Sequence, residues 1–97
     1  MSVKVALEFQ TTPDQVDAMK EFFRAVLPDT RGYEGFESLT MHQNDDDPTS
    51  FFVWEQWATR PRYEAYLAWR TENGDLDKLA VMLTGQPSIR FFNHVGV

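Results

Sequence analysis

The segment 51–70, FFVWEQWATRPRYEAYLAWR, constrains the fold of this chain more than any other part of it. Its first eight residues, 51–58, predict a buried strand. Thr59 and Pro61 then predict the start of a helix, because a threonine hydroxyl caps free amides and proline fits the first helical turn. Aromatic rings are dense on both elements: Phe51, Phe52, Trp54, Trp57, Tyr63, Tyr66 and Trp69. Such a concentration of rings predicts either a large core or an apolar cavity.

The composition narrows the classes of protein that the chain can represent. A length of 97 residues predicts a single domain, 1–97. The chain has no cysteine, which excludes disulfides and thiol chemistry. We expect no membrane span and no signal peptide, and therefore a cytoplasmic protein, because no apolar run approaches roughly 20 residues and the N-terminus lacks a basic region. The net charge of −6 disfavours binding to nucleic acid.

The first half of the chain predicts a strand, a helix and a second strand. Residues 3–9 alternate between apolar and polar, as a half-buried strand does. Residues 12–15 match a capping box and open an amphipathic helix, which we expect Pro28 to end. Residues 36–43 alternate as a second strand, and the acidic run 44–48 predicts a polar hairpin loop.

The second half continues from the strand and helix of 51–70. We expect that helix to end near Gly74, which can adopt a left-handed conformation. Asp75 is then expected to cap a short helix to about residue 84, and residues 88–97 alternate as a last strand. The order β-α-β-β-α-(α)-β is typical of the ferredoxin-like α+β fold, a four-stranded antiparallel sheet with helices on one face.

Apolar side chains on both faces of this sheet predict a partner. Two helices shelter only one face, and an exposed patch of several hundred Å² is more than monomers usually carry. We therefore predict an isologous homodimer in which two sheets pack face to face. The side chains assigned to this interface are Leu39, Met41, Phe52, Trp54 and Phe92.

The motif Glu55-x-Trp57, followed by a short capped turn and a helix, resembles the antibiotic biosynthesis monooxygenase (ABM) family of the dimeric α/β-barrel superfamily. The likeness covers essentially the whole chain, including the segment 32–37 with its two glycines, Phe36 and Glu37. It implies a dimeric α/β barrel that oxygenates a quinol or anthrone-like aromatic without a cofactor. Family relatives also degrade haem.

The helix after this motif departs from the family pattern. Tyr66 stands where the family often has a histidine, and Arg70-Thr71 stand where a second histidine often follows. This departure argues against haem ligation through that helix and against a mechanism that needs those imidazoles. Because His42 and His94 are the only histidines and no carboxylates stand at ligand spacing, we expect no metal. The resemblance implies that no cofactor is needed.

A cofactor-free oxygenase needs ring-lined walls, a base and a group that stabilises an oxyanion. Following the resemblance, we predict that the substrate-binding residues are Trp57, Tyr66 and Trp69, and that the catalytic residues are His42, Glu55 and Arg90. His42 has the titration range of a general base, and Arg90 could stabilise a developing oxyanion. Glu55 is a candidate acid or base because it falls on an otherwise apolar face.

Each candidate also has an interpretation without chemistry. Trp57 and Tyr66 lie at core spacing, His42 can be a surface residue at a strand end, and Arg90 can be an ion-pair partner. Glu55 can be held by a salt bridge, for example from the arginines at 60 and 62.

The alternative function is a non-catalytic ligand-binding or stress-associated dimer with the same fold and a filled cavity. A cavity of a few hundred Å³ beside Trp57 and Tyr66 would favour a binding site, and a packed site would favour a scaffold. A third class, a single-stranded RNA binder, is disfavoured by the negative charge.

Overall fold

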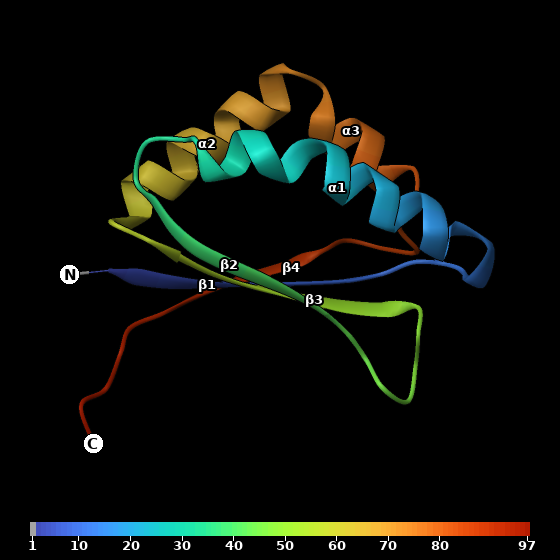
Figure 1. Cartoon of the computed structure of the whole chain (residues 1–97), viewed down its shortest axis with the longest axis horizontal. Helices are drawn as coiled ribbons and strands as arrows, with labels where there is room; N and C mark the ends of the chain where they lie inside the picture. Colours follow the sequence, from blue (N-terminus) through green and yellow to red (C-terminus); the bar gives the residue numbers. More distant parts are fainter. Residues whose placement is uncertain (1) are drawn as a thin grey trace.

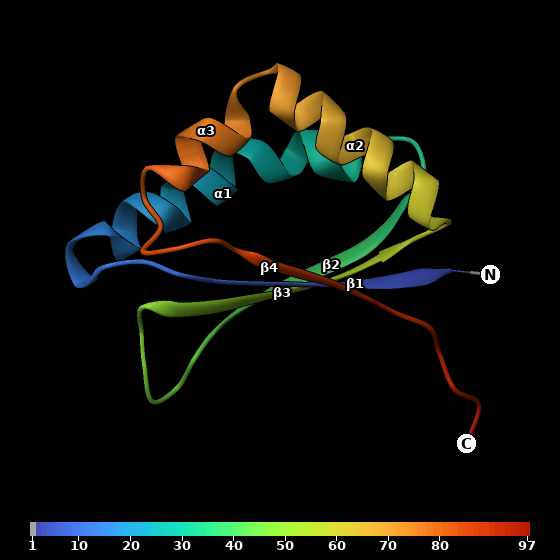
Figure 2. The ribbon, with the colours of Figure 1, turned by 180° about the vertical axis from the view of Figure 1, so that it is seen from behind.

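The computed structural model describes residues 2–97 and has one sheet with helices on one of its faces (Figures 1 and 2). The antiparallel strands follow the order β2-β3-β1-β4. The strands are β1 (Val3–Gln10), β2 (Phe36–Gln43), β3 (Ser50–Trp57) and β4 (Ser88–Phe92). The helices are a 3₁₀ turn (Pro13–Gln15), α1 (Val16–Arg31), α2 (Arg60–Glu72) and α3 (Asp75–Ala80). This is the ferredoxin-like α+β fold that the sequence predicts.

The start and the end of α1 differ from the prediction. No capping box forms: the Thr12 hydroxyl donates to Asp14, and residues 13–15 make a 3₁₀ turn instead. Pro28 does not end the helix, which continues to Arg31. The ring of Pro28 is exposed, so the carbonyl left without its amide partner can reach water. Beyond it, the buried Thr30 bonds to side chains of α2, and these contacts hold the last turn in place.

The second half of the chain follows the prediction up to Gly74. The Thr59 hydroxyl caps α2 by accepting from the amide of Arg62 at 3.3 Å, and Gly74 has a φ of 78°. Asp75 does not cap α3, because Gly74 occupies the capping position and the Asp75 carboxylate binds Arg70. The short helix ends at Ala80 rather than near residue 84.

The last strand is shorter than predicted. It ends at Phe92, which pairs with Lys4 close to the start of β1. Only Val3 of β1 lies beyond this pair, so a strand that continued to residue 97 would have almost no neighbouring strand to pair with. The residues after Phe92 leave the sheet on the side opposite the helices (Figure 1), and Val95 is 70% exposed.

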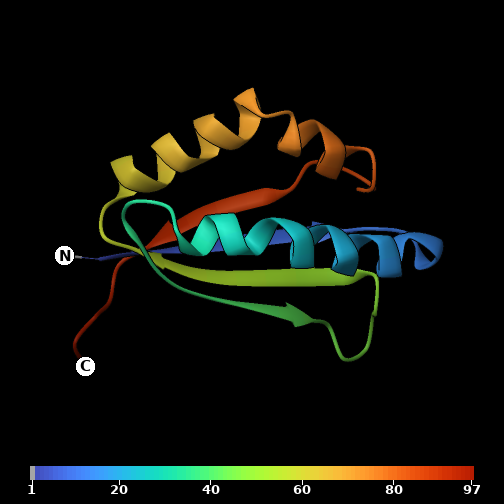
Figure 3. The same cartoon turned by 45° about the horizontal axis from the view of Figure 1, so that its top comes forward.

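The core fills the space between the sheet and the helices, and α1 lies beside the α2–α3 pair over the strands (Figure 3). One cluster of buried side chains comprises Phe9, Met19, Phe23, Phe51, Val53 and Leu79. A second cluster comprises Val3, Val5, Trp57 and Tyr63. The odd-numbered residues of β1 and β3 therefore face the helices, as the period of a strand requires.

A β-bulge in β2 overturns part of the predicted interface. Phe36 pairs with Trp57 and Ser38 with Gln56, so Glu37 is an extra residue in this strand. The bulge reverses the alternation, and it turns Leu39 and Met41 toward the helices, where they pack against the core. Their assignment to the open face of the sheet was therefore wrong.

The open face keeps a narrower apolar band of three rings. Phe52 stacks with Trp54 at 6.0 Å between ring centroids, and Trp54 lies 6.0 Å from Phe92. Trp54 is 37% exposed and Phe92 is 40% exposed. Polar pairs flank the band, including Arg90 with Glu8 at 2.6 Å. Within residues 2–97, no helix has the length and apolar character needed to cross a membrane.

Candidate active site

Glu55 is a buried carboxylate without a cationic partner among residues 2–97. It lies on the helix-facing side of β3, between Val5 and Leu39 on the neighbouring strands, and it is 4% exposed. Its hydrogen bond comes from the indole Nε1 of Trp57, which donates to Oε1 at 3.0 Å. Arg60 and Arg62, the expected ion-pair partners, bind Glu64 and Glu34 instead. The salt-bridge interpretation of Glu55 is therefore wrong.

Burial controls the protonation of this carboxylate. Removal from water raises the pKa of Glu55 to about 7, and the hydrogen bond from Trp57 opposes that rise. Both protonation states of Glu55 are therefore populated near neutral pH. A group with this property can accept a proton from a bound molecule or donate one to it.

Rings from β3 and α2 gather beside Glu55. Trp57 is fully buried and lies 4.9 Å from the ring of Tyr66 and 5.6 Å from that of Tyr63. Trp69 lies farther along α2, 6.3 Å from Tyr66. The structure therefore brings Glu55, Trp57 and Tyr66 together, with Trp69 at the margin of the cluster.

A small cavity lies between this cluster and the helices. Its volume is about 60 Å³, and its polar wall is formed by Glu55, Tyr63, Tyr66, Arg70 and Asp75. Trp57 and Trp69 contact Tyr66 but are not part of the wall. A cavity that holds benzene measures roughly 150 Å³. The space is therefore smaller than the few hundred Å³ that would favour binding, and a ring enters only if a wall moves.

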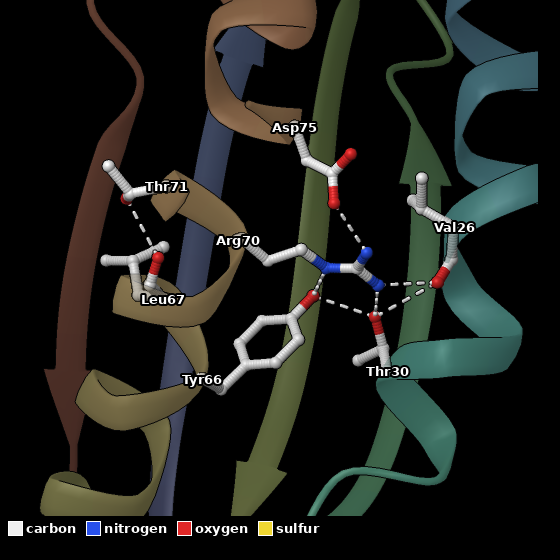
Figure 4. A network of polar contacts seen from close by, with 7 residues as sticks. All are labelled: Val26, Thr30, Tyr66, Leu67, Arg70, Thr71 and Asp75. Carbon is white, nitrogen blue, oxygen red and sulfur yellow. Dashed lines mark hydrogen bonds and ion pairs between the residues drawn. The ribbon is translucent and has the colours of Figure 1, made fainter. Parts of the chain in front are cut away.

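Arg70 joins this wall to all three helices (Figure 4). It is 4% exposed, and its Nε donates to the Tyr66 hydroxyl at 3.0 Å. Its Nη1 donates to Asp75 at 2.8 Å, and its Nη2 donates to the Val26 carbonyl at 2.6 Å and to the Thr30 hydroxyl at 2.9 Å. The hydroxyl groups of Thr30 and Tyr66 also bond to each other at 2.7 Å. These bonds satisfy a cation that would be costly to bury alone.

Arg70 was not predicted as a residue of the site, although the sequence contains a signal for it. Arg70 follows Tyr66 by four residues, so the two side chains share one face of α2. Tyr66 and Arg70 are also the two positions at which the sequence lacks the histidines of the ABM-family pattern that it otherwise resembles. Their hydrogen bond shows that the two departures form one structural unit.

Two predicted catalytic residues lie away from this cluster. His42 pairs with Phe52 in the sheet, so it belongs to the open face, where its ring bonds to the Thr40 hydroxyl at 2.9 Å. Arg90 lies on the same face and binds Glu8. The sheet separates both of them from Glu55. The structure therefore does not bring His42, Glu55 and Arg90 into one site within a chain.

Comparison with known proteins identifies the family. Residues 2–72 match the family model described as antibiotic biosynthesis monooxygenase. The chain belongs to this family. Family membership supports a monooxygenase-like function. No protein with a curated description matches the sequence.

Within residues 2–97, no three His, Asp or Glu side chains are grouped to hold a metal ion.

Solved structures share the fold along nearly the whole chain. A conserved protein from Methanosarcina mazei Go1 superposes with a TM-score of 0.86 at 15% identity, covering 95% of this chain and 91% of that one. SnoaB, a cofactor-independent oxygenase from Streptomyces nogalater, superposes with a TM-score of 0.85 at 14% identity, covering 99% and 95%. A putative antibiotic biosynthesis monooxygenase from Nitrosomonas europaea gives 0.81 at 22% identity, covering 98% and 91%. At these identities the likeness shows the fold alone.

Proposed function

We propose that the protein is a cofactor-independent monooxygenase that acts on a small, electron-rich aromatic such as a quinol, with Glu55 as the proton acceptor. The observation that supports this most strongly is the position of Glu55, a buried carboxylate that forms no ion pair within residues 2–97, on the wall of a ring-lined cavity. Burial brings the pKa of Glu55 to about 7, which suits a base at neutral pH.

The substrate itself supplies the electrons in this proposal. Glu55 takes the proton of a phenolic hydroxyl, and the resulting anion is electron-rich enough to react with O₂. One oxygen atom enters the ring as a hydroxyl or carbonyl oxygen, and the other leaves as water with two hydrogens from the substrate. Burial raises the pKa of Tyr63, so its hydroxyl stays protonated and can donate to an oxygen of the substrate. The surrounding rings exclude water from the anion.

The small volume of the cavity favours the alternative function. A space of about 60 Å³ has room for a few water molecules but not for a ring. If the walls do not move, the protein is a non-catalytic ligand-binding or stress-associated member of the same fold. Turnover therefore has to be tested directly.

We also propose that the protein works as a homodimer. The rings of Phe52, Trp54 and Phe92 form a continuous band on the face that the helices leave uncovered, and Trp54 and Phe92 are exposed there. A second copy packed sheet to sheet would shelter this band on both chains at once.

Oxygen consumption with a reduced naphthoquinol tests the proposed activity. Glu55→Gln keeps the shape of the side chain but removes the base, so we expect the rate to fall by about a hundredfold or more. Trp57→Ala should also lower the rate, because it removes a ring of the cluster, and so should Tyr66→Phe, because it removes the hydroxyl that binds Arg70 and Thr30 at the cavity wall. Glu64→Gln is the control, since Glu64 is an exposed carboxylate on α2. Equal rates for the wild type and Glu55→Gln would refute the role of Glu55, and a wild-type rate no higher than autoxidation would favour the alternative.

A further inference from the structure

The ion pair between Arg70 and Asp75 closes the same cavity that the proposed function uses. Among the described residues that line this cavity, Arg70 is the only one with a cationic side chain. The side chain of Arg70 is 5% exposed, whereas that of Asp75 is 15% exposed. Solvent therefore approaches the pair from the side of Asp75, and this carboxylate covers the guanidinium.

The hydrogen bonds of Arg70 divide into a fixed set and an exchangeable one. Nε and Nη2 bind Tyr66, Thr30 and the Val26 carbonyl, groups that belong to the long helices α1 and α2. Only Nη1 binds α3, through a single bond to one oxygen of Asp75. A second acceptor could therefore replace Asp75 while the other bonds hold the guanidinium in position.

The charges in the cavity make such a replacement favourable during the proposed reaction. When Glu55 accepts a proton it becomes neutral, and the substrate becomes an anion in an apolar space. An anion there needs a cationic partner, because its desolvation is otherwise costly. The Asp75 carboxylate already neutralises Arg70, so an anion gains this cation as its full partner only if Asp75 gives way.

The position of Asp75 allows it to give way together with a wall of the cavity. It lies in the first turn of α3, directly after Gly74, whose φ of 78° marks a sharp change of direction. The helix has six residues, and Leu76 and Leu79 from it also line the cavity. Displacement of α3 would therefore free Arg70 and enlarge the space at the same time.

We propose that Arg70 is the anion-binding residue of this cavity and that an aromatic anion takes the place of Asp75 on its Nη1. The inference rests on the proposed function, since it assigns a substrate class to the same site. It predicts that the cavity selects aromatic molecules that carry an ionised oxygen over neutral molecules of the same shape.

Calorimetric binding of two oxidised probes tests this preference without turnover. The anionic probe is 2-hydroxy-1,4-naphthoquinone and the neutral probe is 2-methoxy-1,4-naphthoquinone, both at pH 7. We expect the wild type to prefer the anion and Asp75→Asn to increase that preference about tenfold or more, because the competing carboxylate is removed. Arg70→Gln should abolish it.

Asp77→Asn is the matched control, because it removes the same charge from an exposed position of the same helix. It should leave the preference unchanged. An equal increase in Asp77→Asn and Asp75→Asn would show a general charge effect and overturn the proposal, as would equal binding of both probes or no binding to any variant. If Arg70→Gln does not fold, the comparison of Asp75→Asn with Asp77→Asn still shows whether removal of the Asp75 carboxylate increases the preference for the anionic probe. Because oxidised probes consume no oxygen, this outcome is separate from that of the turnover assay.

Discussion

Glu55 combines two properties that a stable core usually avoids, deep burial and the absence of a cationic partner in the part of the chain that the structure describes. Its single indole hydrogen bond only partly replaces the water that the carboxylate has lost. The ionised form therefore raises the free energy of the folded state. Such a cost is typical of functional sites, where a perturbed carboxylate is kept because its chemistry is needed.

This burial predicts how the stability of the protein depends on pH. The pKa of Glu55 is about 7 when folded against an ordinary value of 4.5, so the folded state binds the extra proton between these values. The free energy of unfolding should therefore fall as pH rises from about 4.5 to about 7, by about 3 kcal/mol at most. Glu55→Gln should remove that contribution, so its stability relative to wild type should be greater at pH 8 than at pH 5. Urea unfolding at both values measures this, and parallel pH profiles for the two proteins would contradict it.

The sequence predicted the part of the site that comes from neighbouring segments. Glu55 and Trp57 lie two residues apart on one strand, and Tyr66 lies on the helix that follows, so local periodicity was enough to group them. The partners of Arg70 on α1 lie 40 or more residues away along the chain. No local pattern reports such a contact, because it depends on how α1 and α2 pack.

At the scale of elements, the prediction that successive β2 side chains alternate strictly between the two faces of the sheet was wrong at the bulge in this strand. The extra residue Glu37 moves Leu39 and Met41 from the predicted open face to the core. The order of the strands and helices could be predicted, since it follows from hydrophobic periods and caps. The face of each strand residue could not, because a single inserted residue reverses it.

Replacing the two glycines with positive φ by alanine should lower the free energy of unfolding by unequal amounts. Gly35 has a φ of 92°, and a Cβ there would lie 2.6 Å from the Cβ of Arg62. Gly74 has a φ of 78°, but a Cβ there would meet no atom within 4 Å. Gly74→Ala should therefore lower the free energy of unfolding by about 1 kcal/mol, the cost of the left-handed backbone. Gly35→Ala should lower it by clearly more, because a steric clash is added. Urea unfolding of both variants checks this, and equal losses would show that α2 moves freely away from Gly35.

At the scale of the whole molecule, the uncovered face of the sheet predicts the oligomeric state. Trp54 lies at the centre of the exposed ring band, between Phe52 and Phe92, so in a sheet-to-sheet dimer it would be fully buried. Trp54→Lys would place a charge in that interface, and an unpaired buried charge is costly enough to dissociate it. Sedimentation of the wild type at micromolar concentration should give twice the chain mass of 11.3 kDa, and Trp54→Lys should give the single mass. Val81→Lys is the control, because it also introduces a lysine, at a side chain that is 82% exposed next to α3. This variant should remain dimeric. A monomeric wild type would refute the dimer, and loss of the dimer in both variants would point to a general effect of charge rather than to this face.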